Sequence, residues 1–509
     1  MVVEPNSAQL AAIAEDLGFV FDEDDIRLFR TMLAGPIAGY ARLDALPDAL
    51  PLPRYPRLPG YSPAEAENPF GAFARIVAVR GAHDGPLAGR QLGVKDCICV
   101  AGVPMTNGSA TFDGYVPEVD ATVVTRLLDA GATIVAKTAN EDMCYSGGSH
   151  TNARGPVDNP WKPGHTAGGS SSGSAAAVGG GVLDIALGTD QGGSVRAPAS
   201  CCGAVGMKPT YGLVSCTGVL GMEYSLDHVG PITRDVADSA RVLSVIAGSD
   251  GLDMRQGTAA AADYTADLAR GVDGLRIGLL CEGFGRPQSD SRVDEAVSRA
   301  ARHLSDSGAT VVDITVPLHV DAGAIWLPRA AEGCLATIFH GNGFGHGPKG
   351  VYLPSAMHRQ SLWRSQANLL ADTVKLGMLA GEYMRRAYGG RYYGRAHNLA
   401  RLLTAAYDEA LANVDVFIMP TLPILPPKRP DRKDSREASI AAAYEMTVNT
   451  SAFNATGHPS LSLPCAVIEG LPVGMMITGP MFGERMIYRV AAAVERAVGD
   501  LGGPSRRKL

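Results

Sequence analysis

The sequence predicts an α/β fold, in which a large mixed β-sheet is covered by helices. Short β-rich runs alternate with helical segments over most of the chain, a pattern typical of such sheets. Hydrophobic residues make up 46% of the 509 residues and charged residues 19%, which indicates a soluble globular protein with a large core. The net charge of −7 is spread without long runs of one sign, so we expect no nucleic acid and no membrane as a partner.

The first part of the chain is predicted to be helical. Residues 6–35 carry apolar side chains at helical spacing, with a break near Gly18. Residues 47–68 are rich in proline and should form an extended connector. We therefore expect an N-terminal helical segment with its connector over residues 1–69, followed by the main domain over residues 70–509.

The strands and helices of the main domain follow in order. A strand ends at Lys95, and a helix in TVVTRLLDAGA precedes the strand TIVAK. The apolar run VLDIALGT predicts a further strand. Later in the chain, a strand–helix–strand unit is predicted from LRIGLL (275–280), a helix over 293–307 and TVVDITV (310–316). The pattern closes with VDVFIMP (414–420), the pair LSLPCAV and GMMITGP, and the final helix ERMIYRVAAAVERAV.

Residues 318–400 interrupt this alternation. They are rich in aromatic residues and have glycine-rich turns between helices. One interpretation is a variable helical insertion that forms a lid or lines the substrate pocket, and the other is a helical subdomain with its own small core. The candidate pocket residues in this segment are Trp326, Tyr352 and Trp363.

Three short segments carry the chemistry. They are LGVKD around Lys95, AGGSSSGS beginning at Ala167, and GTDQGGSVRAPAS beginning at Gly188. A serine hydroxyl becomes a good nucleophile when an adjacent base takes its proton. Lysine acts as that base only when neutral, so it must be desolvated or strongly hydrogen-bonded. One lysine and two glycine-embedded serines therefore predict an acyl-transfer enzyme with an alkaline optimum.

The glycine- and serine-rich run has a simpler interpretation as a flexible linker. Against it, the run lies between NPWKPG and a predicted strand, and a second Gly-Gly-Ser at residues 192–194 follows that strand directly. Glycines there permit tight turns and let backbone amides point at a bound oxygen. The spacing matches neither a GxSxG elbow nor a phosphate loop. A structural role for Ser194 is the alternative, although a buried hydroxyl would need a partner.

The remaining composition bears on cofactors and location. The eleven histidines form no HxxxH or HxH pair, so we predict no metal site, and the proposed chemistry requires no cofactor. The nine cysteines lie at unrelated positions, and the N-terminus lacks a basic start followed by an apolar run. We therefore expect reduced thiols in a cytoplasmic protein.

The motifs together resemble the amidase signature family. The similarity runs from about Phe70 to the C-terminus, and the segments that carry it are NPW (159–161), GGSSSGS (168–174), GTDQGGSVRAP (188–198), GAVGMKPTYGLV (203–214), DHVGPITRD (227–235), NATGHPSLSLP (454–464) and GLPVGMMITGP (470–480). The resemblance implies the amidase signature fold for residues 70–509 and a Ser–cisSer–Lys triad. Ser194 matches the nucleophile, Ser170 the serine that follows a cis peptide bond, and Lys95 the general base.

The resemblance also implies supporting roles. The oxyanion hole corresponds to the backbone amides of Gln191, Gly192, Gly193 and Ser194. Ser171 and Asp190 match positions that support the loops. Arg196 either anchors the nucleophile loop or is a salt-bridged structural residue. The chain departs from the usual GGSSGGS by having serine at Ser172, away from the triad. The substrate-binding candidates are Gln191, Gly147, Trp326, Tyr352 and Trp363.

Within the family, the motifs look most like bacterial nitrile-pathway amidases. That similarity implies hydrolysis of small aliphatic or aromatic amides through an acyl-enzyme, with carbamates, anilides or esters as further substrates, and a homodimer formed with help from the N-terminal helices. Three alternatives stay open: a carbamate-specific urethanase, the glutaminase component of an amidotransferase, and a non-catalytic binding protein. The amidotransferase group usually has glutamine where this chain has Ala197, and a pseudoenzyme has no need to keep all three triad residues.

Overall fold

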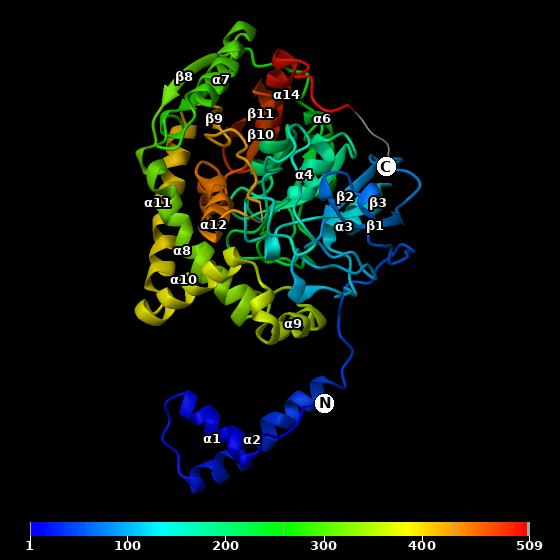
Figure 1. The fold of residues 1–509 in the computed structure, drawn as a ribbon, viewed down its shortest axis with the longest axis vertical. Helices are drawn as coiled ribbons and strands as arrows, with labels where there is room; N and C mark the ends of the chain where they lie inside the picture. Colours follow the sequence, from blue (N-terminus) through cyan, green and yellow to red (C-terminus); the bar gives the residue numbers. More distant parts are fainter. Residues whose placement is uncertain (1, 258, 432, 506–509) are drawn as a thin grey trace. The chain divides into compact units, whose positions relative to one another are not determined.

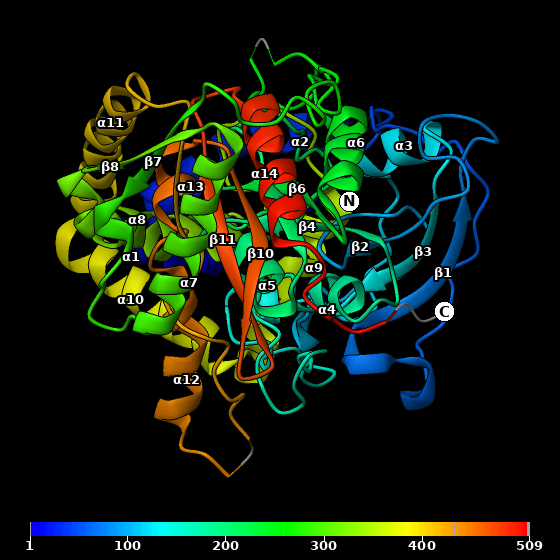
Figure 2. The same cartoon turned by 90° about the horizontal axis from the view of Figure 1, so that it is seen from above.

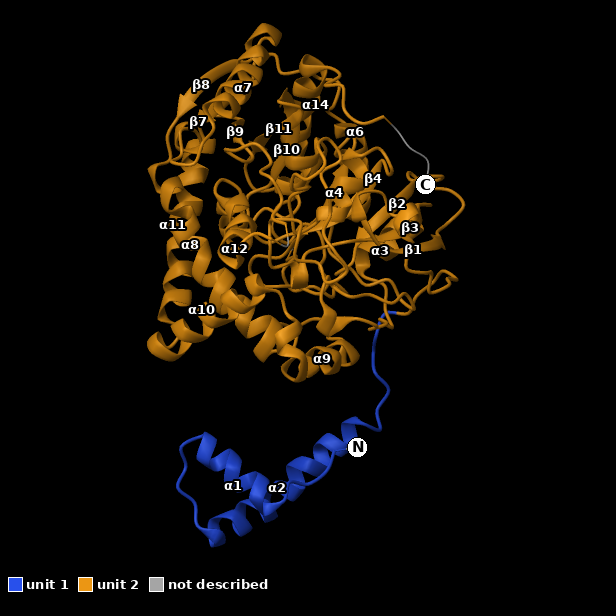
Figure 3. Cartoon of the chain, in the orientation of Figure 1, with its two compact units in different colours: residues 1–51 blue, residues 52–509 orange. Residues whose placement is uncertain are grey.

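The computed structural model describes residues 2–257, 259–431 and 433–505, and it divides into two compact units, Met1–Pro51 and Leu52–Leu509 (Figure 3). The division comes earlier than the predicted boundary near residue 70. The connector packs onto the larger unit, because Tyr61 forms a β-bridge with Ile76 and Arg57 forms an ion pair with Asp120. Between residues 47 and 68 the chain forms no helix or strand other than the 3₁₀ turn Glu65–Glu67.

The smaller unit is a pair of helices, α1 (Ser7–Asp16) and α2 (Glu23–Leu43). Each helix begins with a capping box, from Asn6 and Asp22, in which the side chain accepts hydrogen bonds from the first turn. The unit buries little of its apolar surface. Large apolar side chains that remain exposed include Ile13, Leu17, Phe19, Phe21, Leu28, Phe29 and Met32.

The larger unit is built on one mixed sheet of eleven strands, which confirms the predicted fold class. The strands are β1 (Phe73–Arg80), β2 (Gln91–Lys95), β3 (Thr133–Thr138), β4 (Ile185–Asp190), β5 (Val205–Lys208), β6 (His228–Thr233), β7 (Arg276–Leu280), β8 (Thr310–Ile314), β9 (Val416–Pro420), β10 (Ser460–Ile468) and β11 (Leu471–Thr478). Their spatial order is β1-β3-β2-β4-β6-β5-β10-β11-β9-β7-β8. Figures 1 and 2 show β1, β2 and β3 on one side of this unit and β7 and β8 on the other.

Two groups of helices cover the sheet. In the first group neighbouring helices contact one another in the order α3 (Thr122–Asp129), α6 (Val236–Ile246), α14 (Glu484–Val498) and α7 (Ser291–Arg302). The second group is α4 (Ser172–Gly179) and α5 (Arg196–Cys202), which pack against each other. Every residue of the central strands β4, β5, β6, β9 and β11 is buried, so both faces of the sheet are covered there.

The region predicted as an insertion is helical. It contains α8 (Ala322–Pro328), the π-helical turns Arg329–Gly333 and Leu335–His340, α9 (Pro354–Ser361), α10 (Asp372–Tyr388) and α11 (Arg391–Leu411). Two further helices, α12 (Arg436–Tyr444) and α13 (Ala452–Thr456), follow β9. Helices α8, α10 and α11 lie side by side (Figures 1 and 2). Residues of α8 and α11 share a hydrophobic cluster with β9 and β11, so the insertion packs on the sheet rather than around a separate core.

The remaining helical segments are short 3₁₀ turns, at Glu65–Glu67, Pro69–Gly71, Ala110–Phe112, Asp142–Cys144, Cys281–Gly283, His303–Ser307, Pro317–Asp321, Leu362–Leu369 and Glu445–Thr447. Within the described part of the chain, we find no helix with the length and apolar character needed to cross a bilayer.

Candidate active site

The three signature segments meet at one edge of the sheet. Strands β2 and β4 are parallel neighbours, with Val94 opposite Leu187, so their carboxyl ends lie together. Lys95 is the last residue of β2, and the loop that carries Ser194 follows β4. Ser170 lies just before α4 begins at Ser172. Segments from three distant parts of the sequence thereby come within hydrogen-bonding distance.

Lys95 is completely buried and has two hydroxyl partners. Its Nζ donates to Ser170 Oγ at 2.7 Å and to Thr189 Oγ1 at 2.7 Å. The peptide bond between Gly169 and Ser170 is cis, as the family resemblance implied. The sequence identified Lys95 and Ser170 but missed Thr189, because a threonine inside a buried strand carries no distinguishing signal.

Ser194 lies at the wall of a cavity, whereas Lys95 and Ser170 are buried. Ser171 connects the two serine loops. Its backbone N–H donates to Ser194 O at 3.3 Å, and its Oγ donates to Thr189 O at 3.2 Å. The supporting position predicted for Ser171 is therefore where the two loops touch.

Asp190 and Arg196 form a fully buried ion pair that holds the Ser194 loop. Arg196 donates to both carboxylate oxygens of Asp190 at 3.0 Å, and Asp190 also accepts the N–H groups of Gly193 at 2.7 Å and Val195 at 3.0 Å. Burial by itself would raise the pKa of Asp190, but the Arg196 guanidinium and these donors hold it well below its usual range. The ion pair makes Arg196 both the anchor of the loop and a structural residue.

The bond to Asp190 corrects one prediction about the oxyanion hole. The N–H of Gly193 is already donated to a carboxylate, so it is not available to a substrate oxygen in this conformation. In the described residues, no acceptor lies within hydrogen-bonding distance of the N–H groups of Gln191, Gly192 and Ser194. Of the four predicted donors, these three remain.

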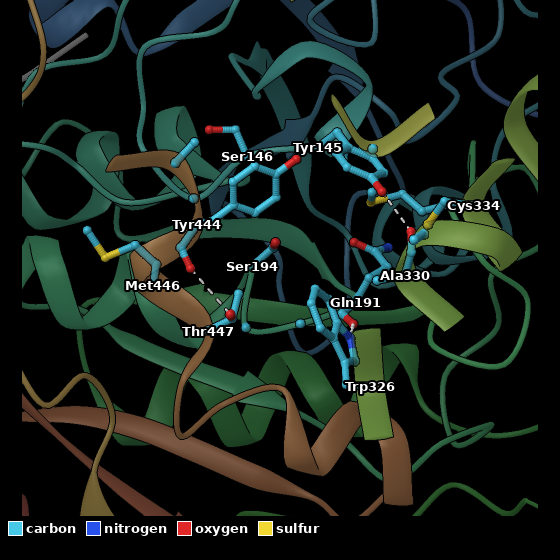
Figure 4. Close-up of a pocket in the computed structure, with 18 of the residues that line it drawn as sticks. Tyr145, Ser146, Gln191, Ser194, Trp326, Ala330, Cys334, Tyr444, Met446 and Thr447 are labelled. Atoms are coloured by element: carbon cyan, nitrogen blue, oxygen red, sulfur yellow. Dashed lines mark hydrogen bonds between the residues drawn. The ribbon is translucent and has the colours of Figure 1, made fainter. Parts of the chain in front are cut away.

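Ser194 opens on a cavity of about 350 Å³ (Figure 4). Of the substrate-binding candidates, Gln191, Gly147 and Trp326 line it. Gln191 Nε2 donates to Asp227 Oδ1 at 3.0 Å. The other lining residues are Cys144, Tyr145, Ser146, Gly169, Gly192, Gly193, Met222, Leu226, Leu327, Ala330, Ala331, Cys334, Leu376, Gly377, Ala380, Ala443, Tyr444, Met446 and Thr447. Over the described residues, this wall contains no Asp, Glu, Lys, Arg or His side chain, so the cavity suits an uncharged ligand.

Two predicted pocket residues lie elsewhere, and their assignment was wrong. Tyr352 lines a separate cavity of about 60 Å³ and donates its hydroxyl to Pro348 O at 2.8 Å. Trp363 packs edge-on against Phe339 and donates Nε1–H to Phe339 O at 3.4 Å. Aromatic content identified the insertion but not which of its faces meets the cavity.

Two of the segments that supply missed wall residues are residues 144–146 after β3 and residues 443–447 around the end of α12. Others are Met222, Leu226 and side chains of the insertion between residues 327 and 380. Tyr145 is held by its Oη, which donates to Ala330 O at 2.8 Å, and it lies against Gly377 of α10. A Cβ on Gly377 would come within 2.4 Å of the Tyr145 ring, so glycine is needed for this contact. The Ser-Gly-Gly sequence at residues 146–148 was the available signal for the first segment.

Buried ionisable groups surround the site. Burial raises the pKa of the Asp142 carboxyl to about 6. Burial also opposes ionisation of Cys144, but the hydrogen bond with the neighbouring Cys97 thiol and the charge of Lys95 lower its pKa. Ser172, the departure from the usual motif, donates to Glu141 Oε1 at 3.3 Å, and the backbone N–H of Glu141 in turn donates to Ser170 O at 3.2 Å.

Comparison with known proteins agrees with this geometry. The family model described as Amidase matches residues 71–488. The chain is 41% identical over 505 residues to an enantioselective amidase of Rhodococcus rhodochrous, covering 98% of this chain and 97% of that protein. It is 39% identical over 432 residues to one component of the glutamyl-tRNA(Gln) amidotransferase of Halobacterium salinarum, covering 84% of this chain and 100% of that protein.

A solved structure gives the same result. The native peptide amidase from Stenotrophomonas maltophilia is similar with a TM-score of 0.66 at 31% identity, covering 81% of this chain and 83% of that chain. Its similarity extends over most of the larger unit. The resemblance predicted from the motifs is thus confirmed: the chain belongs to the amidase signature family and is an amidohydrolase.

Proposed function

We propose that this amidohydrolase cleaves small uncharged amides through an acyl-enzyme on Ser194. The observation that carries the proposal is the buried Lys95–Ser170 hydrogen bond of 2.7 Å next to the cavity that Ser194 lines. A base joined to a hydroxyl relay beside a half-buried serine that lines a cavity is the arrangement that nucleophilic acyl transfer needs.

In the proposed cycle, Ser194 Oγ attacks the amide carbonyl carbon while its proton passes through Ser170 to neutral Lys95. The negative oxygen of the tetrahedral intermediate is stabilised by the free N–H groups of the loop. The C–N bond then breaks as the proton returns through Ser170 to the leaving amine. Water attacks the resulting ester through the same relay, which releases the carboxylic acid and restores Ser194.

The cavity supports the substrate class. Its wall is apolar and uncharged over the described residues, and about 350 Å³ is near the lower end of the usual range for small-molecule pockets. The relative from Rhodococcus, named an enantioselective amidase, matches this chain over nearly its whole length. Carbamates present the same type of carbonyl group, so an aryl carbamate belongs among the substrates to be tested.

The amidotransferase alternative has support of its own, because the relative from Halobacterium is 39% identical to this chain. Free glutamine carries an ammonium and a carboxylate, and burying either without a partner is costly. An uncharged wall therefore favours neutral amides over glutamine.

We also propose a cytoplasmic homodimer. The exposed apolar side chains of α1 and α2 provide a surface that a second copy would bury. All nine cysteines are free thiols, as is usual in a reducing compartment. Light scattering of the full chain should give the dimer mass, and the double variant Leu28→Glu/Met32→Glu should shift it to the monomer. A monomeric wild type at micromolar concentration would refute the dimer.

The experiment that tests the activity compares the wild type with Ser194→Ala on benzamide, an aliphatic amide, a p-nitroanilide, an aryl carbamate and glutamine. We expect turnover of a neutral amide that is lost in Ser194→Ala, and labelling of Ser194 by a fluorophosphonate probe. Ser172→Gly, which restores the usual family residue, is the matched control and should retain activity. Turnover of glutamine alone would indicate the amidotransferase function, and no labelling of Ser194 would reject the mechanism.

A further inference from the structure

Four consecutive carbonyl groups of the Ser194 loop each accept a hydrogen bond. Asp190 O accepts from Asn454 Nδ2 at 2.9 Å, and Gln191 O accepts from Trp326 Nε1 at 2.8 Å. In the next two peptides, Gly192 O accepts from Thr450 Oγ1 at 2.6 Å and Gly193 O accepts from Ala197 N at 2.7 Å.

These bonds orient the amide groups as well. A trans peptide is planar, and its N–H points away from its C=O. Holding the carbonyl of one residue therefore sets the direction of the N–H of the next. The peptide between Gly192 and Gly193 is held at both ends, by Thr450 and by Asp190.

The peptide between Gln191 and Gly192 is held only at its carbonyl end, as are the peptides whose N–H groups belong to Gln191 and Ser194. The donor to the Gln191 carbonyl is the indole N–H of Trp326. At the other end, the N–H of Gly192 meets no acceptor in the described residues, and Gly192 lines the cavity. The orientation of this free donor therefore depends on one side chain, which comes from α8 in the helical insertion.

The glycine at position 192 fits this arrangement. A Cβ there would lie 2.7 Å from Cζ2 of the Trp326 ring, which is too close for a real contact. Glycine thus lets the indole approach the loop closely enough to reach Gln191 O. Figure 4 shows the Trp326 ring next to Gln191 at the cavity that Ser194 lines.

We infer that Trp326 is a positioning residue for the oxyanion hole: its indole N–H fixes the Gln191–Gly192 peptide so that Gly192 N–H faces the developing oxyanion. The same ring forms part of the cavity wall, so a bound substrate would contact the side chain that orients the Gly192 N–H. This inference rests on the proposed function, in which Ser194 is the nucleophile.

The test is Trp326→Phe, which keeps an aromatic wall and removes the N–H. With benzamide we expect kcat to fall about 10- to 100-fold with little change in KM, since loss of one oxyanion donor typically lowers kcat by about 100- to 1000-fold and this donor is misdirected rather than removed. The affinity for an arylboronic acid, whose tetrahedral adduct with Ser194 places an oxygen in the hole, should fall in parallel. The affinity for an uncharged analogue without a carbonyl group should not change.

Trp363→Phe is the matched control, because it removes an indole N–H that donates to a backbone carbonyl away from the cavity. It should leave kcat and boronate affinity unchanged. If the phenylalanine variant folds poorly, Trp326 can be replaced with benzothienylalanine, which has sulfur in place of the N–H in a ring of similar shape. This variant should show the losses of kcat and boronate affinity expected for Trp326→Phe.

Two results would overturn the inference. One is a benzothienylalanine variant with wild-type kcat and boronate affinity. The other is a rise in KM alone, which would make Trp326 only a wall for the substrate. Failure of the proposed function would look different, since the wild type itself would then show neither amide turnover nor labelling of Ser194.

Discussion

Lys95 Nζ lies 2.7 Å from Thr189 Oγ1, the same distance that separates it from Ser170 Oγ. Thr189 is almost fully buried in β4, so its hydroxyl gives the Lys95 amino group a second hydrogen-bond partner in a region shielded from solvent. A buried amino group that loses a partner costs about 1–3 kcal/mol. The threonine therefore holds Lys95 in the orientation that reaches Ser170.

Replacing this hydroxyl tests its role. Thr189→Val keeps the shape of the side chain and removes the oxygen, so we expect a lower free energy of unfolding and a lower kcat. Thr189→Ser restores the hydroxyl and should recover most of both. Chemical denaturation and steady-state kinetics on one amide measure the two effects. Full activity in Thr189→Val would show that Ser170 alone positions the lysine.

The pH dependence of the wild-type rate tests Lys95 as the base. The lysine must give up its ammonium proton before it accepts one from Ser194, so kcat/KM should rise with pH toward an alkaline optimum. The measurement is hydrolysis of a neutral amide from about pH 5 to pH 10, since the charge of such a substrate does not change. A flat profile over that range would contradict the assignment.

The ion pair between Asp190 and Arg196 should dominate the stability of the loop. Arg196→Met leaves the Asp190 carboxylate buried without its cation, and such losses cost about 3–5 kcal/mol. The double variant Asp190→Asn/Arg196→Met should lose less stability than the single variant, because no charge is left unpaired. Denaturation curves of the wild type, of Arg196→Met, of Asp190→Asn and of the double variant give the comparison, and additive losses would argue against the pairing.

The low pKa of Asp190 also predicts how stability responds to acid. A carboxyl with a depressed pKa in the folded state contributes stability above its unfolded pKa of about 3.9, and this is lost as the pH falls further. In Asp190→Asn this acid-dependent part should be absent.

The ionisation of Asp142 should have the opposite effect on stability to that of Asp190. Its carboxyl accepts the N–H of Ala371 at 2.7 Å just before α10, and burial raises its pKa to about 6. Between about pH 4 and pH 6 the folded state keeps a proton that the unfolded state has lost, so stability falls as the pH rises through this window.

Asp142→Asn removes this dependence. At pH 8 we expect the variant to gain on the order of 3 kcal/mol in the free energy of unfolding, because the pKa of Asp142 is raised from 3.8 to about 6 and each pKa unit corresponds to about 1.4 kcal/mol. At pH 4 the two proteins should be nearly equal. The exposed Asp48→Asn is the control, and an equal gain at both pH values would rule out titration of Asp142 as the cause.

Local pattern was sufficient for the fold class, and short motifs carried the family resemblance that assigns the triad. The spacing of apolar residues within a run such as VLDIALGT or ERMIYRVAAAVERAV depends only on whether that run forms a strand or a helix. The alternation of such runs along the chain therefore predicted a mixed sheet covered by helices, as the structure has it. Lys95, Ser170 and Ser194 lie in contiguous motifs at strand ends and glycine-rich turns. Because each motif is contiguous, the family resemblance could assign these residues, although Lys95 and Ser170 are 75 residues apart in the sequence.

Tertiary structure decided the pocket and the details of the oxyanion hole. Thr189, Tyr145 and the indole N–H of Trp326 act through partners that lie far away in the sequence or on another strand. Aromatic content did not distinguish Trp326, which meets the cavity, from Trp363, which packs on Phe339. The reason is physical: a cavity wall is made where separate helices and loops converge, and the side of a helix that meets the cavity depends on what packs against its other side.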